Sequence, residues 1–112
     1  MATNDERIQN LAKRKRRPIG PGEMAAGLLE ELEISRAEFT RRLAISRPQA
    51  TQLLSGKAAL SPDMALRLGR FFGNGPQLWL NLQRNRDLWD LLNFDDTIYD
   101  QIVPVEDWRK AA

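Results

Sequence analysis

A chain of 112 residues, 42% hydrophobic and without cysteine or histidine, has room for one modest domain and lacks disulfides, the common metal ligands and the usual general base. Its net charge of +2 is unevenly distributed along the chain. Residues 1–73 hold 13 basic and 8 acidic residues, whereas residues 74–112 hold 4 basic and 7 acidic ones. Such an asymmetry is expected when one face of a protein meets nucleic acid. We therefore expect no enzyme, metal or cofactor, and, without a signal sequence or membrane-length apolar run, a cytoplasmic protein.

The first two predicted helices are read from apolar spacing and from the residues at their ends. The first follows the Pro-Gly pair at 21–22 and carries apolar residues at helical spacing as far as Glu33. The second begins after Ser35, whose hydroxyl can cap the helix while Glu38 reaches back to complete a capping box. It stops at residues 44–45.

Three more helices are predicted in the middle of the chain. The third is capped by Ser46 and ends at Gly56, which supplies a left-handed exit. The fourth begins after Ser61, with proline in its first turn, and ends at Gly73. The fifth covers residues 76–92. The sequence thus predicts an all-α, five-helix domain over residues 21–92.

Both ends of the chain lie outside this domain. Residues 1–20 are polar and are expected to form a flexible basic arm. The arm's basic run is Lys13, Arg14, Lys15, Arg16 and Arg17. It either wraps the duplex as an arm, following phosphates or entering a narrow minor groove, or stays a solvated tail. Residues 93–112 form an acidic C-terminal extension, expected to be one short strand or an irregular tail.

The segment 35–56 has the spacing of a helix-turn-helix, in which two short helices share a small core and the second enters the major groove. Arginine and glutamine can each pair with a base edge through two hydrogen bonds. The residues assigned to base reading are Arg47, Gln49, Thr51 and Gln52. Those assigned to DNA phosphates are Arg36, Arg42, Ser46 and Lys57. The plainer alternative is a helical hairpin with a solvated polar face, but residues 34–57 hold five basic residues and one acid, which favours DNA.

Three segments together resemble HigA-type antitoxins, which are lambda-repressor-like helix-turn-helix proteins of type II toxin–antitoxin modules. They read RPIGPGEM at 17–24, SRPQATQLLSGKAALSPDMALRLGRFFG at 46–73 and PQLWLNLQRNRDLW at 76–89. The resemblance implies a dimer that binds operator DNA, represses its own operon and neutralises a RelE-like mRNA interferase toxin of HigB type. It covers roughly residues 16–92.

Two residues depart from the usual helix-turn-helix pattern. Ala44 stands in the turn where this class usually has glycine with a positive φ, and a left-handed alanine costs roughly 1 kcal/mol. Thr40 stands where such motifs usually carry an alanine facing the second helix.

The apolar residues of the fifth helix divide between the core and a possible dimer contact. Trp79 is predicted to be a core residue. Leu80, Leu88 and Trp89 are the candidates for a dimer interface. A two-fold dimer would place its recognition helices about one DNA turn, ~34 Å, apart on an inverted-repeat operator. A toxin would contact residues 1–20 or 93–112, and the acidic extension suits a basic partner.

Two other functions fit the same sequence. One is a plain helix-turn-helix repressor with no toxin partner, which predicts no toxic neighbouring gene. The other is a protein-interaction module that has lost DNA binding, which predicts no change in DNA mobility in a shift assay.

Overall fold

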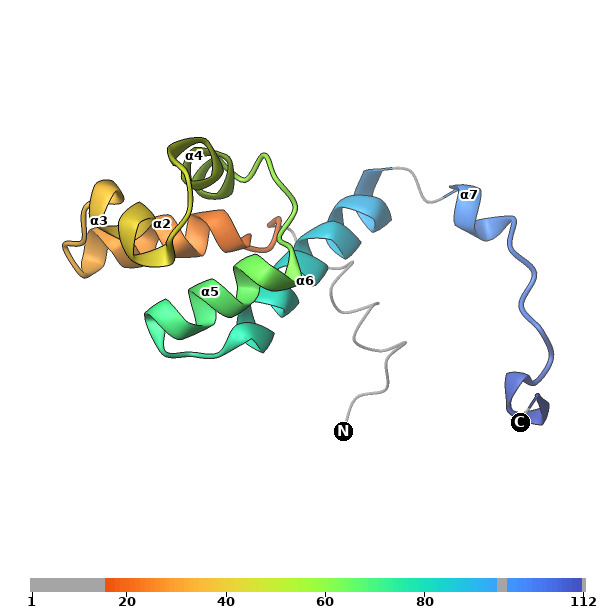
Figure 1. The fold of residues 1–112 in the computed structure, drawn as a ribbon. Helices are drawn as coiled ribbons and strands as arrows, with labels where there is room; N and C mark the ends of the chain where they lie inside the picture. Colours follow the sequence, from red (N-terminus) through yellow and green to blue (C-terminus); the bar gives the residue numbers. More distant parts are fainter. Residues whose placement is uncertain (1–15, 95–96, 112) are drawn as a thin grey trace.

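The computed structural model describes residues 16–94 and 97–111, and every regular element in these ranges is helical (Figure 1). The elements are α2 (Pro21–Glu31), α3 (Arg36–Leu43), α4 (Arg47–Ser55), α5 (Pro62–Phe72), α6 (Pro76–Phe94), α7 (Thr97–Asp100) and a 3-10 turn (Trp108–Lys110). Helices α2 to α6 are the five predicted ones. The short strand considered for residues 93–112 is absent from their described part, which instead forms the end of α6, α7 and the turn. No described helix has both the length and the apolarity needed to span a bilayer.

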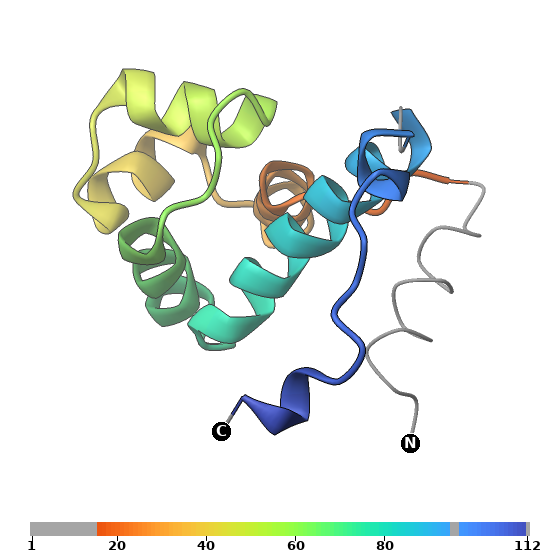
Figure 2. The same ribbon diagram turned by 90° about the vertical axis from the view of Figure 1, so that its right-hand side faces the viewer.

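The five domain helices pack as a bundle around one core. Helix α5 packs along α6, α3 packs on α4 and α5, and α2 packs on α4 and α6. Figure 2 shows α2 nearly end-on between α4 and α6. Helix α4 is therefore contacted by both α3 and α2.

Aromatic side chains fill the centre of the domain. Trp79, Phe39 and Leu68 are its largest fully buried residues, which confirms the core assignment of Trp79. The Trp79 ring stacks on Phe72 with centroids 5.3 Å apart, and its indole Nε1 donates to Asn74 Oδ1 at 2.8 Å. The one polar atom of this large side chain is thus paired, so its burial carries no unsatisfied hydrogen bond.

Serine residues cap the N-termini of α3, α4 and α5. Ser35, Ser46 and Ser61 each accept a hydrogen bond from the backbone N–H three residues on. The capping box predicted at Ser35 is only half formed, because the Glu38 carboxylate faces Arg42 one turn along the helix, at 3.6 Å. A complete box is found at Ser46 instead, and the sequence reading missed it.

The turn between α3 and α4 contains the left-handed alanine that the sequence predicts. Ala44 has φ 55° and ψ 47°. This conformation brings Cβ close to the following carbonyl oxygen, a strain that glycine avoids. The neighbouring departure, Thr40, is accommodated within α3, since its hydroxyl donates to the Arg36 carbonyl at 2.7 Å.

Replacing Ala44 with glycine is expected to stabilise the protein. The relieved left-handed strain of about 1–2 kcal/mol exceeds the extra chain entropy of glycine, leaving a gain of up to about 1 kcal/mol in the free energy of unfolding. Urea denaturation followed by circular dichroism measures it. Ala37→Gly in the helical part of α3 is the control and should destabilise. A loss of stability in both variants would contradict the strain argument.

Candidate DNA-binding surface

Helix α4 exposes one polar face and buries the other. Ala50 and Leu53 are buried and Leu54 is half-buried against the core, as the predicted inward positions require. The exposed residues are Arg47, Pro48, Gln49, Thr51, Gln52 and Ser55. All four side chains assigned to base reading therefore lie on the solvent side of this helix.

Gln49 differs from the other three because its side chain completes the cap of α4. Its Oε1 accepts from the Ser46 backbone N–H at 2.8 Å, while the Ser46 hydroxyl accepts from the Gln49 N–H at 3.2 Å. Two-bond pairing with adenine needs both the carbonyl and the amide of a glutamine. In this arrangement Gln49 has only its amide N–H groups to offer, whereas Gln52 has both ends of its side chain.

A shallow hollow between α3 and α4 gathers basic residues from both helices. Arg36 and Arg47, assigned to phosphate and base contact, lie on it. The full lining is Arg36, Ala37, Thr40, Arg41, Arg47, Ala50 and Thr51. The sequence reading missed Arg41. Arg41 is exposed and lines the same hollow as Arg36. Helical periodicity did not group the two, because residues five apart lie about 140° apart around an ideal helix.

The remaining phosphate candidates have different surroundings. Lys57 is exposed directly after α4, at the end of the same surface. The Arg42 guanidinium lies over the ring of Phe71, 4.7 Å from its centroid, and near the Glu38 carboxylate. It is therefore held on the side of α3 that faces α5.

Arg67 on α5 fastens the turn of the helix-turn-helix. Its Nη1 donates to the carbonyl oxygens of Leu43 and Ala44, at 2.7 and 3.0 Å, and its Nε donates to Asp63 at 2.9 Å. These carbonyls stand at the C-terminal end of α3, where they have no partner within the helix. The partners of Arg67 lie 23 and 24 residues away along the chain, so the sequence carries no local signal for these contacts.

Replacing Arg67 with methionine is expected to destabilise the domain by about 1–2 kcal/mol, since charge-assisted hydrogen bonds to two helix-end carbonyls are lost at a partly exposed position. Methionine keeps most of the apolar stem. Arg70→Met, an exposed arginine on the same helix, is the control and should change little. Thermal unfolding of the two variants measures the difference, and equal melting temperatures would argue against a role for Arg67 in holding the turn.

A close contact between α2 and the end of α4 sets how α4 is presented. A Cβ on Gly22 would lie 2.1 Å from the Leu53 carbonyl oxygen and 3.2 Å from the Gly56 backbone nitrogen. Only glycine allows this approach of two backbones. The contact gives a structural reason for Gly22 in the RPIGPGEM segment.

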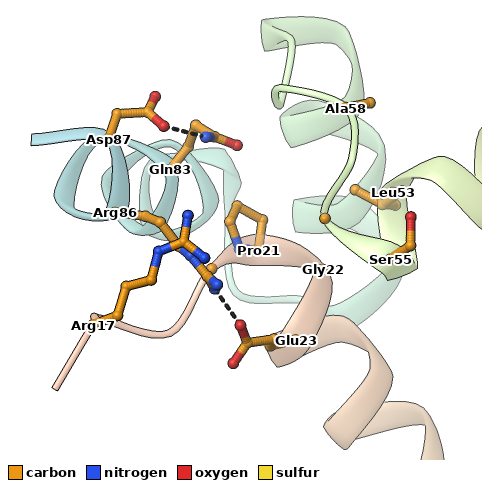
Figure 3. Close-up of a pocket in the computed structure, with 12 residues that line it drawn as sticks. Arg17, Pro21, Gly22, Glu23, Leu53, Ser55, Ala58, Gln83, Arg86 and Asp87 are labelled. Atoms are coloured by element: carbon orange, nitrogen blue, oxygen red, sulfur yellow. Dashed lines mark hydrogen bonds and ion pairs between the residues drawn. The ribbon is translucent and has the colours of Figure 1, made fainter. Parts of the chain in front are cut away.

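Ion pairs tie α2 and the segment before it to α6 beside a small polar pocket, and Figure 3 shows the Arg86–Glu23 pair at this pocket. Arg17 donates to both carboxylate oxygens of Asp90, at 2.7 and 2.5 Å, and Arg86 pairs with Glu23. The Arg17 hydrogen bonds lower the pKa of Asp90, and the same bonds raise the pKa of Arg17. Of the basic run, Arg17 is thus anchored to the domain and Arg16 is exposed, while Lys13, Arg14 and Lys15 lie outside the described residues.

Gln83 on α6 holds the loop that follows α4. Its Oε1 accepts from the Leu60 backbone N–H at 2.9 Å, and its amide donates to Asp87 at 2.9 Å. Together with buried Trp79, this bond accounts physically for the ends of the WLNLQ segment. Trp79 and Gln83 therefore stabilise the packing of α6 on the rest of the domain, and they do not lie on the exposed face of α4.

The far end of α6 is apolar and partly open. All three dimer candidates are half-buried: Leu88 and Trp89 lie near this end, whereas Leu80 lies near the start of α6 and packs against the core. Beyond them Leu91 and Phe94 are 51% and 93% exposed. Trp89 and Phe94 line a shallow hollow at this end together with Asp90 and Asn93.

Known proteins resemble this chain in both sequence and fold. The chain is 42% identical over 78 residues to YddM, an HTH-type transcriptional regulator of Escherichia coli, covering 70% of this chain and 80% of the regulator. It is 34% identical over 84 residues to antitoxin HigA-1 of Vibrio cholerae, covering 74% and 79%. The structure of Pseudomonas aeruginosa antitoxin HigA with the higBA promoter matches with a TM-score of 0.70 at 36% identity, over 80% of this chain and 99% of that one.

No family model matches the chain. The shared region nevertheless includes most of the length of each of these proteins, at identities above 30%. The all-helical fold and the helix-turn-helix agree with it. The chain belongs to the HigA family of helix-turn-helix antitoxins and DNA-binding regulators.

Proposed function

We propose that this protein is a cytoplasmic antitoxin that binds an inverted-repeat operator as a dimer, represses its own operon and neutralises a RelE-like mRNA interferase toxin encoded beside it. The observation that carries the DNA-binding part is the exposed face of α4 beside the arginine-lined hollow of α3. A promoter complex of a relative that shares this fold supports it. The toxin part is supported by the antitoxin names among the relatives.

In this proposal Arg47, Gln52 and Thr51 read base edges, and Gln49 adds a contact through its amide group. Arg36, Ser46 and Lys57 contact phosphates, and we add Arg41 because it lies on the same hollow as Arg36. Phosphate contacts set the register and much of the affinity but carry no sequence information. The basic run 13–17 follows the backbone from the point where Arg17 is anchored on α6.

Arg47→Ala and Gln52→Ala are each expected to lower operator affinity by about 1–3 kcal/mol and to remove discrimination at one base position. Fluorescence anisotropy with the operator and with single-base variants of it measures both effects. Arg84→Ala, an exposed arginine on α6, is the control and should bind as the parent does. A loss that is equal for every DNA sequence would make these residues phosphate contacts.

Dimerisation is assigned to the apolar end of α6. Leu80, Leu88 and Trp89 lie on this helix, and exposed Leu91 and Phe94 continue the same end. A two-fold dimer that binds an inverted repeat must hold its two α4 helices about one DNA turn, ~34 Å, apart. Light scattering at micromolar concentration should give twice the mass of one chain.

The proposal as a whole is tested by expressing the neighbouring gene with and without this one. The product of that gene should arrest growth alone, should be harmless when this chain is present and should purify as a complex with it. A plain repressor, which the regulator names among the relatives also suggest, would bind the upstream DNA and give neither rescue nor a complex. A protein that leaves the DNA unshifted would be an interaction module instead.

A further inference from the structure

The C-terminal tail, residues 97–111, exposes an unusual amount of apolar side chain for its length. Every residue of the tail is exposed. Six of them are large hydrophobic residues with exposed fractions from 45% to 88%: Ile98, Tyr99, Ile102, Val103, Val105 and Trp108. Soluble proteins rarely leave such a concentration uncovered unless it is an interaction site.

The tail does not contribute to the domain. All of the buried hydrophobic residues of the core lie between Ala25 and Trp79. Figure 1 shows α7 and the C-terminal turn beyond the end of α6, away from α3 and α4.

The backbone of residues 102–105 has free hydrogen-bond donors on one edge only. The Ile102 N–H donates to the Tyr99 carbonyl at 3.1 Å, and Pro104 has no N–H. The N–H groups of Val103 and Val105 have no acceptor within the described part of the chain. In an extended strand, alternate residues point their N–H groups to the same edge. One edge thus carries both free donors, and the other carries the proline, which is the pattern of an edge strand.

Charge indicates the kind of surface that such a strand would meet. The stretch 93–112 has five acidic residues against two basic ones. In the described tail, acidic side chains stand on either side of the apolar run, Asp100 before it and Glu106 and Asp107 after it. A basic surface beside the open edge of a β-sheet would complement these charges. The segment could bind there by adding a strand to the sheet, a mode in which backbone hydrogen bonds give affinity and side-chain pockets give specificity.

We propose that residues 97–108 are the segment that docks the toxin, with residues 102–105 added as an edge strand to a sheet of that basic protein. This inference rests on the proposed function, because the toxin is the partner it assigns. The domain helices then remain available for operator DNA while the tail holds the partner protein.

The test measures binding of full-length variants to the purified product of the neighbouring gene by calorimetry. Val103→Asp with Val105→Asp places two charges on the apolar run and is expected to weaken binding more than tenfold. Ala26→Asp with Ala111→Asp adds the same two charges at exposed positions outside residues 97–108, and should bind as the parent does. Val105→Pro should bind more weakly than Val105→Ala, because only the proline removes the backbone donor.

Operator binding and molecular mass are measured on the same variants. Unchanged values in the valine variant, together with lost toxin binding, support the docking role. Full toxin binding by that variant overturns the inference and leaves the antitoxin function standing. A change in the mass of the free valine variant would mean that the tail packs on a second copy, which also overturns it. If the parent chain itself binds no neighbouring product, the toxin pairing fails and the inference fails with it.

Discussion

Replacing Trp79 with alanine is expected to lower the free energy of unfolding by about 3–5 kcal/mol, the usual range for removing a buried large aromatic side chain. Trp79 is fully buried, stacks on Phe72 and donates its indole N–H to Asn74. Alanine would leave a cavity at the contact between α5 and α6 and an unpaired Asn74 carbonyl. For a domain of this size, such a loss is a large share of its total stability.

The measurement is urea denaturation followed by far-ultraviolet circular dichroism. Trp108→Ala is a matched control, because that tryptophan is 71% exposed in the tail and outside the core. It should leave the midpoint unchanged. Equal effects of the two substitutions would show that Trp79 does not anchor the fold.

Replacing Gly22 with alanine is expected to destabilise the domain by about 1–3 kcal/mol, as overpacking of a close contact does. The added Cβ would meet the Leu53 carbonyl oxygen at 2.1 Å, and backbone cannot move aside as a flexible side chain does. Helix α2 must therefore shift away from the end of α4. We also expect weaker operator binding by the fraction that remains folded, since α4 would be presented at a changed angle.

Gly27→Ala is the control for this change, because it lies in the same helix with nothing within 4 Å of the added Cβ. It should raise stability by about 0.5–1 kcal/mol, the helix-propensity difference between alanine and glycine. Denaturation and anisotropy on both variants separate the effects. A Gly22→Ala protein that is as stable and as tight a binder as the parent would contradict the close contact.

Much of the fold was predictable from residues whose effect is local. Serine caps, prolines in first turns and glycines at helix ends mark where helices α3, α4 and α5 begin and end. The left-handed Ala44 was also predictable, because its place in a turn of known shape requires a positive φ. Helical spacing placed Ala50 and Leu53 inward and so left the polar face of α4 outward.

The features that sequence reasoning missed depend on contacts between distant residues. The Arg67 bonds to the turn, the Gly22 contact with Leu53 and the anchoring of Arg17 by Asp90 join residues between 23 and 73 positions apart. The cap role of Gln49 was missed for a different reason. Its role in the cap competes with base pairing for the same carbonyl, and the sequence does not say which partner the side chain takes in the free protein.

A footprinting titration of this protein on the DNA upstream of its own gene, with random DNA as competitor, tests whether α4 reads the operator. We expect two protected half-sites in inverted repeat, about 34 Å apart, at concentrations that leave the competitor unbound. Arg47→Ala should lose this protection while its circular dichroism spectrum stays unchanged. Equal affinity for upstream and random DNA, or protection that survives in Arg47→Ala, would contradict the claim that α4 reads the operator.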